Sequence, residues 1–171
     1  MYEGCLADAQ STAVGVSGFF AHTGSNGVDD FRVFGTIEYR ECRVVGCDSG
    51  WGGSQSDCYL AYRCTADNVL NTYSFQANPG GTGAFILGGD VRVRPNFNDG
   101  GLVVFSTNAP RKLVIHGTKC YMTGGGFGPV LITARLSDVS FTRCTFACSV
   151  GGLMKMSRGN ISLRRCVVAY G

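Results

Sequence analysis

Apolar and polar residues alternate along short runs of the chain, and two of these runs share one template. Residues 139–146 read VSFTRCTF and residues 161–168 read ISLRRCVV, with apolar residues at the first, third and eighth places and cysteine at the sixth. Alternation with a period of two is typical of a β-strand that buries one face. Cys144 and Cys166 lie 22 residues apart. The pattern therefore predicts a structural repeat made of short strands.

The same template fits five further segments of the chain. Its sixth position then falls at Phe19, Cys42, Cys64, Asn96, Thr118, Cys144 and Cys166. The two apolar positions before it are Val14 and Val16, Ile37 and Tyr39, Tyr59 and Ala61, Val91 and Val93, Leu113 and Ile115, Val139 and Phe141, and Ile161 and Leu163. Further strands are expected at 84–87, 102–105, 130–132 and 153–156. A period near 22 is too short for helical-pair repeats or propeller blades, and suits a solenoid coil of two or three strands.

We therefore predict an all-β protein, a right-handed parallel β-helix of about seven coils with a period of about 22 residues, forming a single domain over residues 1–171. Coils stacked at the ordinary interstrand spacing would form a rod roughly 30 Å long. Equivalent positions would then form inward columns. One of these columns is a predicted structural ladder of Cys42, Cys64, Cys144 and Cys166.

The composition agrees with this architecture and limits the alternatives. Twenty-six glycines against four prolines fit a chain with many tight turns. The nine cysteines are odd in number, lie mostly within alternating runs and include no C-x2-C pair, so we expect buried thiols rather than disulfides or a zinc site. A net charge of +3 without a basic run predicts no nucleic-acid partner, and no apolar stretch is long enough to predict a membrane span.

The longest gap in the template, between Cys64 and Asn96, contains a polar and glycine-rich excursion. Insertions in solenoids map to loops on one face, which is often the working face. Residues 71–82 are therefore predicted to form an exposed functional loop that includes Asn71, Tyr73, Phe75 and Asn78. A long turn without a function is the alternative interpretation.

Carbohydrate-active enzymes often use parallel β-helices, so carboxylates were the first candidate groups. They are the adjacent pair Asp29 and Asp30, then Asp90 and Asp138. In the template frame Lys112 would lie between Asp90 and Asp138 on an outer face, which predicts a ladder of alternating charge. A glycosidase needs two carboxylates facing each other at a defined separation, and the frame predicts no such pair.

The remaining charged and titratable residues point to surface roles. His116 is predicted to face outward without an acidic neighbour, which argues against acid–base catalysis. Glu41 and Arg63 are predicted to pair on neighbouring coils. A basic patch is expected at Arg143, Arg164 and Arg165. We therefore predict a protein that is not an enzyme, with no catalytic residues, no metal and no cofactor.

The two ends of a solenoid carry unpaired strand edges, which soluble proteins cap or bury against a partner. The last strand runs straight into the terminal residues VVAYG without a polar cap. This predicts a continuing chain, a nicked partner chain or a subunit interface at that end.

Two segments, 138–168 (DVSFTRCTFACSVGGLMKMSRGNISLRRCVV) and 113–124 (LVIHGTKCYMTG), resemble the adenovirus large early-region β-helix protein family. The resemblance covers about 55 residues well and the remainder through the coil period. Its most relevant branch is the atadenovirus left-hand-end relative, a trimeric β-helix knob on the capsid exterior. The human-virus branch is an adaptor that binds a tumour suppressor and directs ubiquitination. Both branches imply a protein that is not an enzyme.

The chain lacks the cysteine- and histidine-dense tail and the acidic stretches of the adaptor branch. The resemblance therefore implies a structural virion protein on the outer capsid surface, which stabilises the capsid and passes through the host nucleus during assembly. The implied partners are two further copies in a homotrimer and other capsid proteins. The alternatives are a phage tailspike-type β-helix that binds or cleaves polysaccharide, and an early viral adaptor that binds host regulators.

Overall fold

The computed structural model describes residues 1–9, 17–22, 33–77, 82–94, 101–105, 112–122, 131–133, 137–148, 154–156 and 159–170. These residues form nineteen strands and no helix, and the strands pair in parallel in a 12-stranded and a 7-stranded sheet. The strands stack as the coils of a solenoid. The prediction of an all-β parallel β-helix is confirmed.

The strands form three faces of the rod, and every coil except the last, which has β18 and β19 alone among the described residues, contributes to all three. The first face holds β1 (Tyr2–Glu3), β4 (Val33–Arg40), the second half of β6 (Ser49–Tyr62), β9 (Gly83–Leu87), β12 (Lys112–His116), β15 (Ser137–Thr142) and β18 (Gly159–Arg164). The second holds β2 (Leu6–Asp8), β5 (Arg43–Val45), β7 (Thr65–Val69), β10 (Asp90–Val93), β13 (Lys119–Met122), β16 (Thr145–Cys148) and β19 (Val167–Tyr170). The third holds β3 (Ser17–His22), the first half of β6, β8 (Asn71–Ala77), β11 (Gly101–Phe105), β14 (Leu131–Thr133) and β17 (Met154–Met156).

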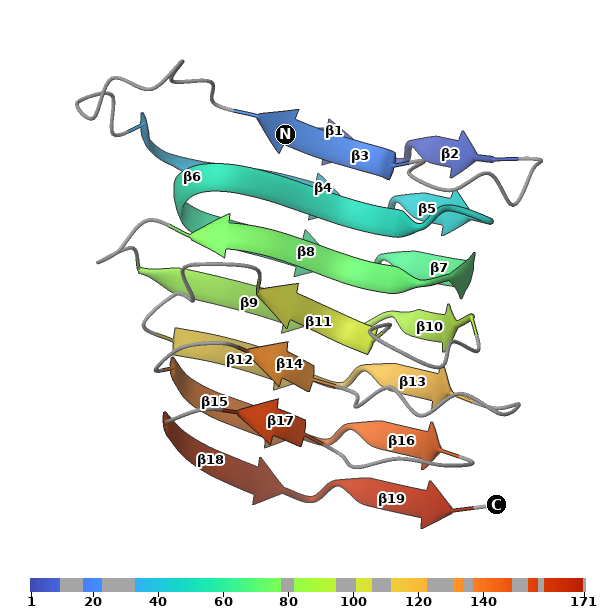
Figure 1. The fold of residues 1–171 in the computed structure, drawn as a ribbon, viewed down its shortest axis with the longest axis vertical. Coiled ribbons are helices and arrows are strands. Elements are labelled where there is room, and N and C mark those ends of the chain that lie inside the picture. Colours follow the sequence, from blue (N-terminus) through green and yellow to red (C-terminus); the bar gives the residue numbers. More distant parts are fainter. Residues whose placement is uncertain are drawn as a thin grey trace.

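The solenoid is right-handed. In Figure 1 the third-face strands β8, β11, β14 and β17 run leftward on the near side, and the chain returns rightward on the far side while it descends from the N-terminus to the C-terminus. The long strand β6 makes one of these corners itself. Its residues Ser49–Ser54 pair with β3 and β8, and its residues Cys58–Tyr62 pair with β4 and β9.

The core is a set of inward columns that run along the rod. The strand register aligns one apolar column of the first face as Tyr2, Tyr39, Ala61, Ile86, Ile115, Phe141 and Leu163. On the second face the matching column is Ala7, Val44, Ala66, Val91, Cys120, Phe146 and Val168. The columns meet inside the rod, where the rings of Phe141 and Phe146 contact edge to face with centroids 5.4 Å apart.

Two of the seven predicted template copies are out of register. Val91 pairs with Ala66 and Cys120 on the second face, so it occupies the eighth template position rather than the first. The strand that stacks between Tyr59 and Leu113 is β9, through Ala84. At the other end, Phe19 lies in the third-face strand β3.

The first coil instead begins at Tyr2, which pairs with Tyr39. Val14 and Val16 lie outside the described residues. Of the other expected strands, those at 102–105, 130–132 and 153–156 correspond to β11, β14 and β17, while residues 84–87 belong to the first face.

One left-handed residue turns the chain from the first face to the second in every coil. These residues have φ between 49° and 75° and are Gly4, Glu41, Arg63, Gly88, Gly117, Arg143 and Arg165. Left-handed backbone costs a non-glycine residue roughly 1–2 kcal/mol. The cost is offset in part because each turn continues the inter-coil ladder, as when Arg63 N donates to Leu87 O at 2.8 Å.

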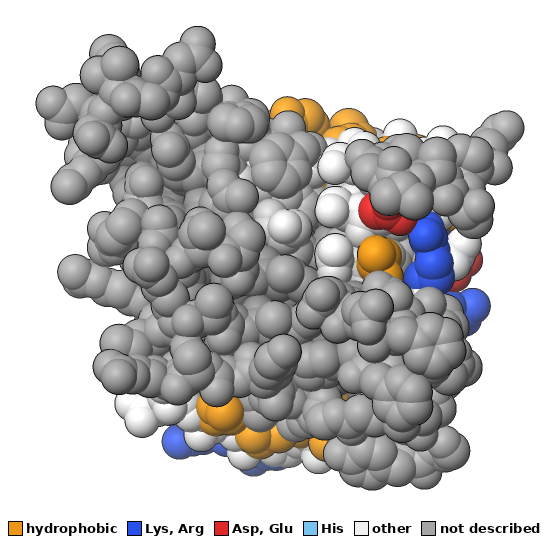
Figure 2. Space-filling view, viewed as in Figure 1, with side chains coloured by type: hydrophobic (Ala, Val, Ile, Leu, Met, Phe, Trp, Pro, Cys, Tyr) orange, Lys and Arg blue, Asp and Glu red, His pale blue; other side chains and the backbone are white. Residues whose placement is uncertain are grey.

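Apolar side chains are exposed at both ends of the rod. At the C-terminal coil Ile161, Leu163 and Val167 are 42%, 43% and 57% exposed, and at the N-terminal coil Tyr2 and Leu6 are 39% and 62% exposed. Figure 2 shows hydrophobic side chains along the upper and lower edges of the molecule, where Figure 1 places these two coils.

Candidate functional site

The predicted cysteine ladder lies at the inner side of the turn between the first and second faces. Each of its residues directly follows the left-handed residue of its coil, and the backbone links neighbours along the column. Thr65 N donates to Cys42 O at 2.9 Å, and Val167 N donates to Cys144 O at 2.9 Å. The complete column is Cys5, Cys42, Cys64, Gly89, Thr118, Cys144 and Cys166. The structure thus places Cys42 beside Cys64 and Cys144 beside Cys166.

The ladder thiols bond to backbone carbonyls. Cys64 Sγ donates to Tyr39 O at 3.4 Å and Cys144 Sγ donates to Ile115 O at 3.3 Å, in both cases reaching the preceding coil. Thr118 also bonds to the preceding coil, where its hydroxyl Oγ1 donates to Gly88 O at 3.0 Å. A small side chain with one weak donor therefore fits this column, which explains the predicted spacing without redox chemistry.

Burial makes several of the thiols poor nucleophiles, among them Cys42, Cys64 and Cys144 of the ladder. Desolvation raises the pKa of Cys42, Cys47 and Cys144, and it raises the pKa of Cys64 to about 12. Only a thiolate attacks an electrophile or binds a metal, so a thiol held protonated is inert at neutral pH. The described cysteines carry free thiols at positions 5, 42, 47, 58, 64, 120, 144 and 166. The ladder is therefore a packing element.

The predicted exposed loop is wrong where the structure describes it. Residues 71–77 form strand β8, which pairs with β6 and β11 inside the third face. Asn71 is half-buried, and Tyr73 is fully buried against Trp51 with ring centroids 5.1 Å apart. The polar residues of this segment had indicated a loop. Phe75 lies in β8 without a described side chain, and Asn78 lies outside the described residues.

The predicted charge ladder on the outer face is only half formed. Lys112 pairs in register with Asp138, as expected. Asp90 lies on the second face instead, where it pairs with Thr65 and Lys119, because the template copy around Val91 was out of register. Asp29 and Asp30 lie outside the described residues.

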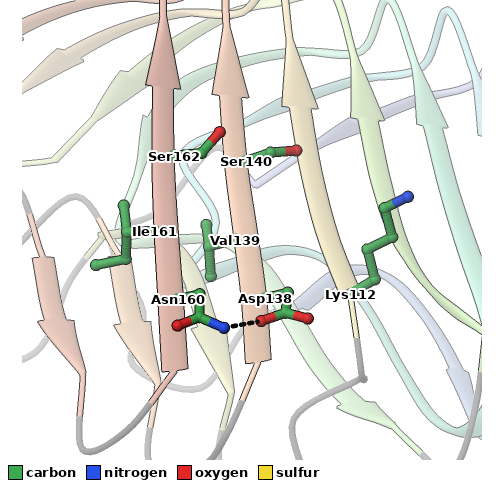
Figure 3. A pocket seen from close by; sticks show the side chains of 7 residues that line it. All are labelled: Lys112, Asp138, Val139, Ser140, Asn160, Ile161 and Ser162. Carbon is green, nitrogen blue, oxygen red and sulfur yellow. Dashed lines mark hydrogen bonds between the residues drawn. The ribbon is translucent and has the colours of Figure 1, made fainter.

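A shallow pocket of about 260 Å³ opens on the outer side of β12, β15 and β18. Its lining residues are Lys112, Asp138, Val139, Ser140, Asn160, Ile161 and Ser162. Figure 3 shows Asp138 and Asn160 side by side, with Ser140 and Ser162 beyond them along the same strands and Lys112 extending away. Asn160 Nδ2 donates to Asp138 Oδ1 at 3.0 Å. Asp138 is the single carboxylate among the lining residues, so this pocket does not supply the paired carboxylates of a glycosidase.

The other predicted surface features are present. His116 is exposed and lies between Leu87 and Thr142 on the neighbouring strands. Glu41 and Arg63 pair with their side-chain oxygen and nitrogen 3.8 Å apart, as predicted, and both side chains are more than half exposed. Such a pair contributes little to stability.

The predicted basic patch lies on the last two coils. Arg143, Arg164 and Arg165 are exposed there, with Arg143 N donating to Arg164 O at 2.9 Å. The patch therefore adjoins the open C-terminal end of the rod.

Sequence reasoning missed one clamp at the turn between the second and third faces. Arg94 Nη1 pairs with Asp48 Oδ1 at 3.0 Å, and its Nη2 donates to the carbonyls of Gly46 at 2.9 Å and Asn68 at 3.2 Å. Both charged side chains are at most one-fifth exposed. One guanidinium thus fastens three successive coils. The two residues are 46 apart in the chain, and only the coil register brings them together.

The described residues contain no group of three His, Cys, Asp or Glu side chains that could hold a metal ion, and no helix among them is long and apolar enough to cross a membrane. Comparison with known proteins gave no match to any family model, to any curated protein or to any solved structure.

Proposed function

We propose that this chain is a structural protein of a viral capsid exterior, working as a homotrimer of β-solenoid rods that stabilises contacts between capsid proteins. The observation that carries the proposal is the construction of the rod. Its columns are buried, and the Arg94 clamp joins three successive coils, so the rod is rigid, as a structural component of an assembly has to be.

The resemblance of residues 138–168 to the adenovirus β-helix family supports the same proposal. In the structure these residues supply the last two coils, β15 to β19, including the basic patch at Arg143, Arg164 and Arg165. That patch is a docking surface for an acidic region of a neighbouring capsid protein, because opposite charges steer and orient an encounter.

The native mass tests the trimer. Light scattering after size exclusion is expected to give three times the chain mass of 18.1 kDa, and negative-stain images should show three rods side by side. Virions reconstituted with the chain should retain it on their surface and resist heating better than virions without it. A stable monomer that does not associate with virions contradicts the proposal.

The pocket beside Asp138 favours a second candidate, a tailspike-type surface that binds polysaccharide. A carboxylate, an amide and two hydroxyls in a grid match the hydrogen-bonding groups of a sugar. Glycan-array binding that is lost in Asp138→Ala and Ser162→Ala but kept in Thr142→Ala, on the same face, supports this candidate. Absence of both glycan binding and glycan cleavage eliminates it.

A further inference from the structure

We propose that copies of this chain associate side by side through the outer side of the first face, with Leu60, Phe85 and Val114 at the centre of the interface. The inference rests on the homotrimer of the proposed function, and it names the flank of the rod on which that trimer is built. These three residues belong to β6, β9 and β12, each of which has a paired first-face strand on both of its sides.

Three consecutive strands of the first face are apolar on both of their sides. Residues 58–62 of β6 read CYLAY, residues 84–87 of β9 read AFIL, and residues 113–115 of β12 read LVI. The later strands β15 and β18 alternate instead, with serine between apolar residues. In parallel sheets, near-continuous apolar runs are typical of strands that are covered on both faces. The solenoid core covers the inner side of these strands, so their outer side is the one left to a partner.

The burial of the neighbouring residues shows which of these side chains point outward. Leu60, Phe85 and Val114 are each flanked on their strand by two residues that are at most 1% exposed. These flanking residues are Tyr59 and Ala61, Ala84 and Ile86, and Leu113 and Ile115. Successive side chains of a strand point to opposite faces. The three central residues therefore point away from the core, and all three are partly exposed.

The outward side chains form one continuous apolar patch. The strand register aligns Leu60, Phe85 and Val114 in a single column, one coil apart. Tyr62 and Leu87, which are also partly exposed, pair with each other in the next column along the same strands. Neighbouring strands lie about 4.8 Å apart, so these five side chains adjoin one another.

Polar residues border the patch along its column. Glu38 lies one coil before Leu60, and Ser140 lies one coil after Val114. The charge of Glu38 is already compensated within the chain, because Arg40 Nε donates to Glu38 Oε1 at 2.7 Å. An apolar centre with a polar margin is typical of protein–protein interfaces.

A second copy of the chain fits this patch in its spacing and in its charges. Its coils repeat at the same interstrand distance, so the side-chain layers of two parallel rods match coil for coil. Asp138 lies near the start of β15 and Arg143 directly follows its end, and both are exposed. Around a three-fold axis parallel to the rods, the starting edge of one face meets the finishing edge of the next, which brings Asp138 of one copy to Arg143 of its neighbour. Opposite charges of this kind orient an encounter, and the three contacts close into a ring.

Light scattering after size exclusion, on the whole chain in reducing buffer over a range of concentrations, tests the patch. Phe85→Thr with Val114→Thr removes the apolar centre but keeps β-branched residues, which strands favour. We expect this double variant to raise the concentration at which the trimer half dissociates by at least about tenfold. Tyr121→Thr with Val45→Thr is the matched control, because it makes the same exchange at partly exposed positions of the second face, and it should leave that concentration unchanged. The fluorescence of the buried Trp51 shows whether each variant folds.

A charge exchange tests the contact between the edges without changing the apolar patch. Asp138→Arg and Arg143→Asp should each weaken association about fivefold, the effect of one surface ion pair, and the two together should restore it. If the patch variant does not fold, this exchange decides the question. Dissociation of the patch variant without an effect of the exchange supports the face and overturns the three-fold contact of its edges.

The oligomeric state of the unchanged chain separates this inference from the proposed function. A trimer that survives both the patch variant and the charge exchange associates through another flank, which overturns the inference and leaves the proposed function standing. A chain that stays monomeric at every concentration contradicts both. A dimer that the patch variant dissociates supports the face as a contact between copies and contradicts the trimer.

Discussion

At the scale of single residues, the buried thiol of Cys64 links stability to pH. Burial raises its pKa from an ordinary 9.0 to about 12, and burial also raises the pKa of Tyr73. The Cys64 thiol binds its proton more tightly in the folded chain than in the unfolded chain. Its contribution to the free energy of unfolding is therefore fully present below pH 9 and is lost as the pH rises toward 12. The free energy of unfolding should fall by about 1.4 kcal/mol per pH unit for one such group.

Urea unfolding measured at pH 8 to 11 checks this, and the fluorescence of the single, fully buried Trp51 reports it. Cys64→Ala should make the fall with pH shallower, while the contribution of Tyr73 remains. An unchanged slope in Cys64→Ala would show that folding does not raise the pKa of this thiol.

Gly89 is the ladder residue that cannot carry a side chain. Its φ is 100°, and a Cβ added there would lie 2.2 Å from Cys64 O, a backbone atom that cannot move aside. Gly89→Ala should therefore lower the free energy of unfolding by at least about 2 kcal/mol. Gly117→Ala is the matched control, because its φ of 66° is left-handed but its nearest neighbour atom is 4.0 Å away. The control should lose only about 1 kcal/mol. Equal losses in thermal or urea unfolding would contradict this account of the column.

At the scale of elements, strand β8 is a core strand and not a loop. Tyr73 stacks on Trp51 inside the third face, and both side chains are fully buried. Tyr73→Ala should destabilise the rod by about 3–5 kcal/mol, because the rod cannot collapse around the lost ring. Tyr121→Ala removes the same ring from a half-buried position beside Arg92, and should cost about 1 kcal/mol. A Tyr73→Ala variant as stable as the Tyr121→Ala variant would restore the interpretation of this segment as an exposed loop.

The sequence predicted correctly the position of those strands whose inward residues clearly match the apolar and cysteine positions of the template. Val139, Phe141 and Cys144 repeat so clearly at Ile161, Leu163 and Cys166 that alternation alone fixed their register. The register of the coil that holds β9 and β10 was predicted wrongly. Gly89 stands where the template has cysteine, and Ala84 is small, so the template matched the stronger alternation around Val91 instead. The register of a strand depends on the strand that lies beside it. When the intervals between repeats vary, the spacing of residues along the chain does not determine which strand that is.

Other features of the structure could not be predicted from any local sequence pattern. The clamp between Arg94 and Asp48 forms between residues 46 apart, and only the coil register brings them together. The pocket beside Asp138 depends on three strands in register, so the sequence predicted its charges on a common face but not its enclosure. The left-handed residue of each turn could not be predicted from the sequence, because in four of the seven coils it is arginine or glutamate rather than glycine.

At the scale of the whole molecule, a solenoid should unfold from its ends. Each coil contacts only its neighbours, so an end coil has one interface where an inner coil has two. The C-terminal coil also has a first-face strand, β18, that is exposed at every residue. Its backbone amides should therefore open locally at much lower cost than those of β9, β10, β12 and β13, which lie between coils on both sides.

Hydrogen exchange followed by mass spectrometry measures this gradient directly. Peptides from β18 and β19 should exchange fastest, and peptides from β10 and β13 slowest, at concentrations where the chain is monomeric. Uniform protection along the rod would instead mean that the coils open as one cooperative unit, contrary to a stack held by nearest-neighbour contacts.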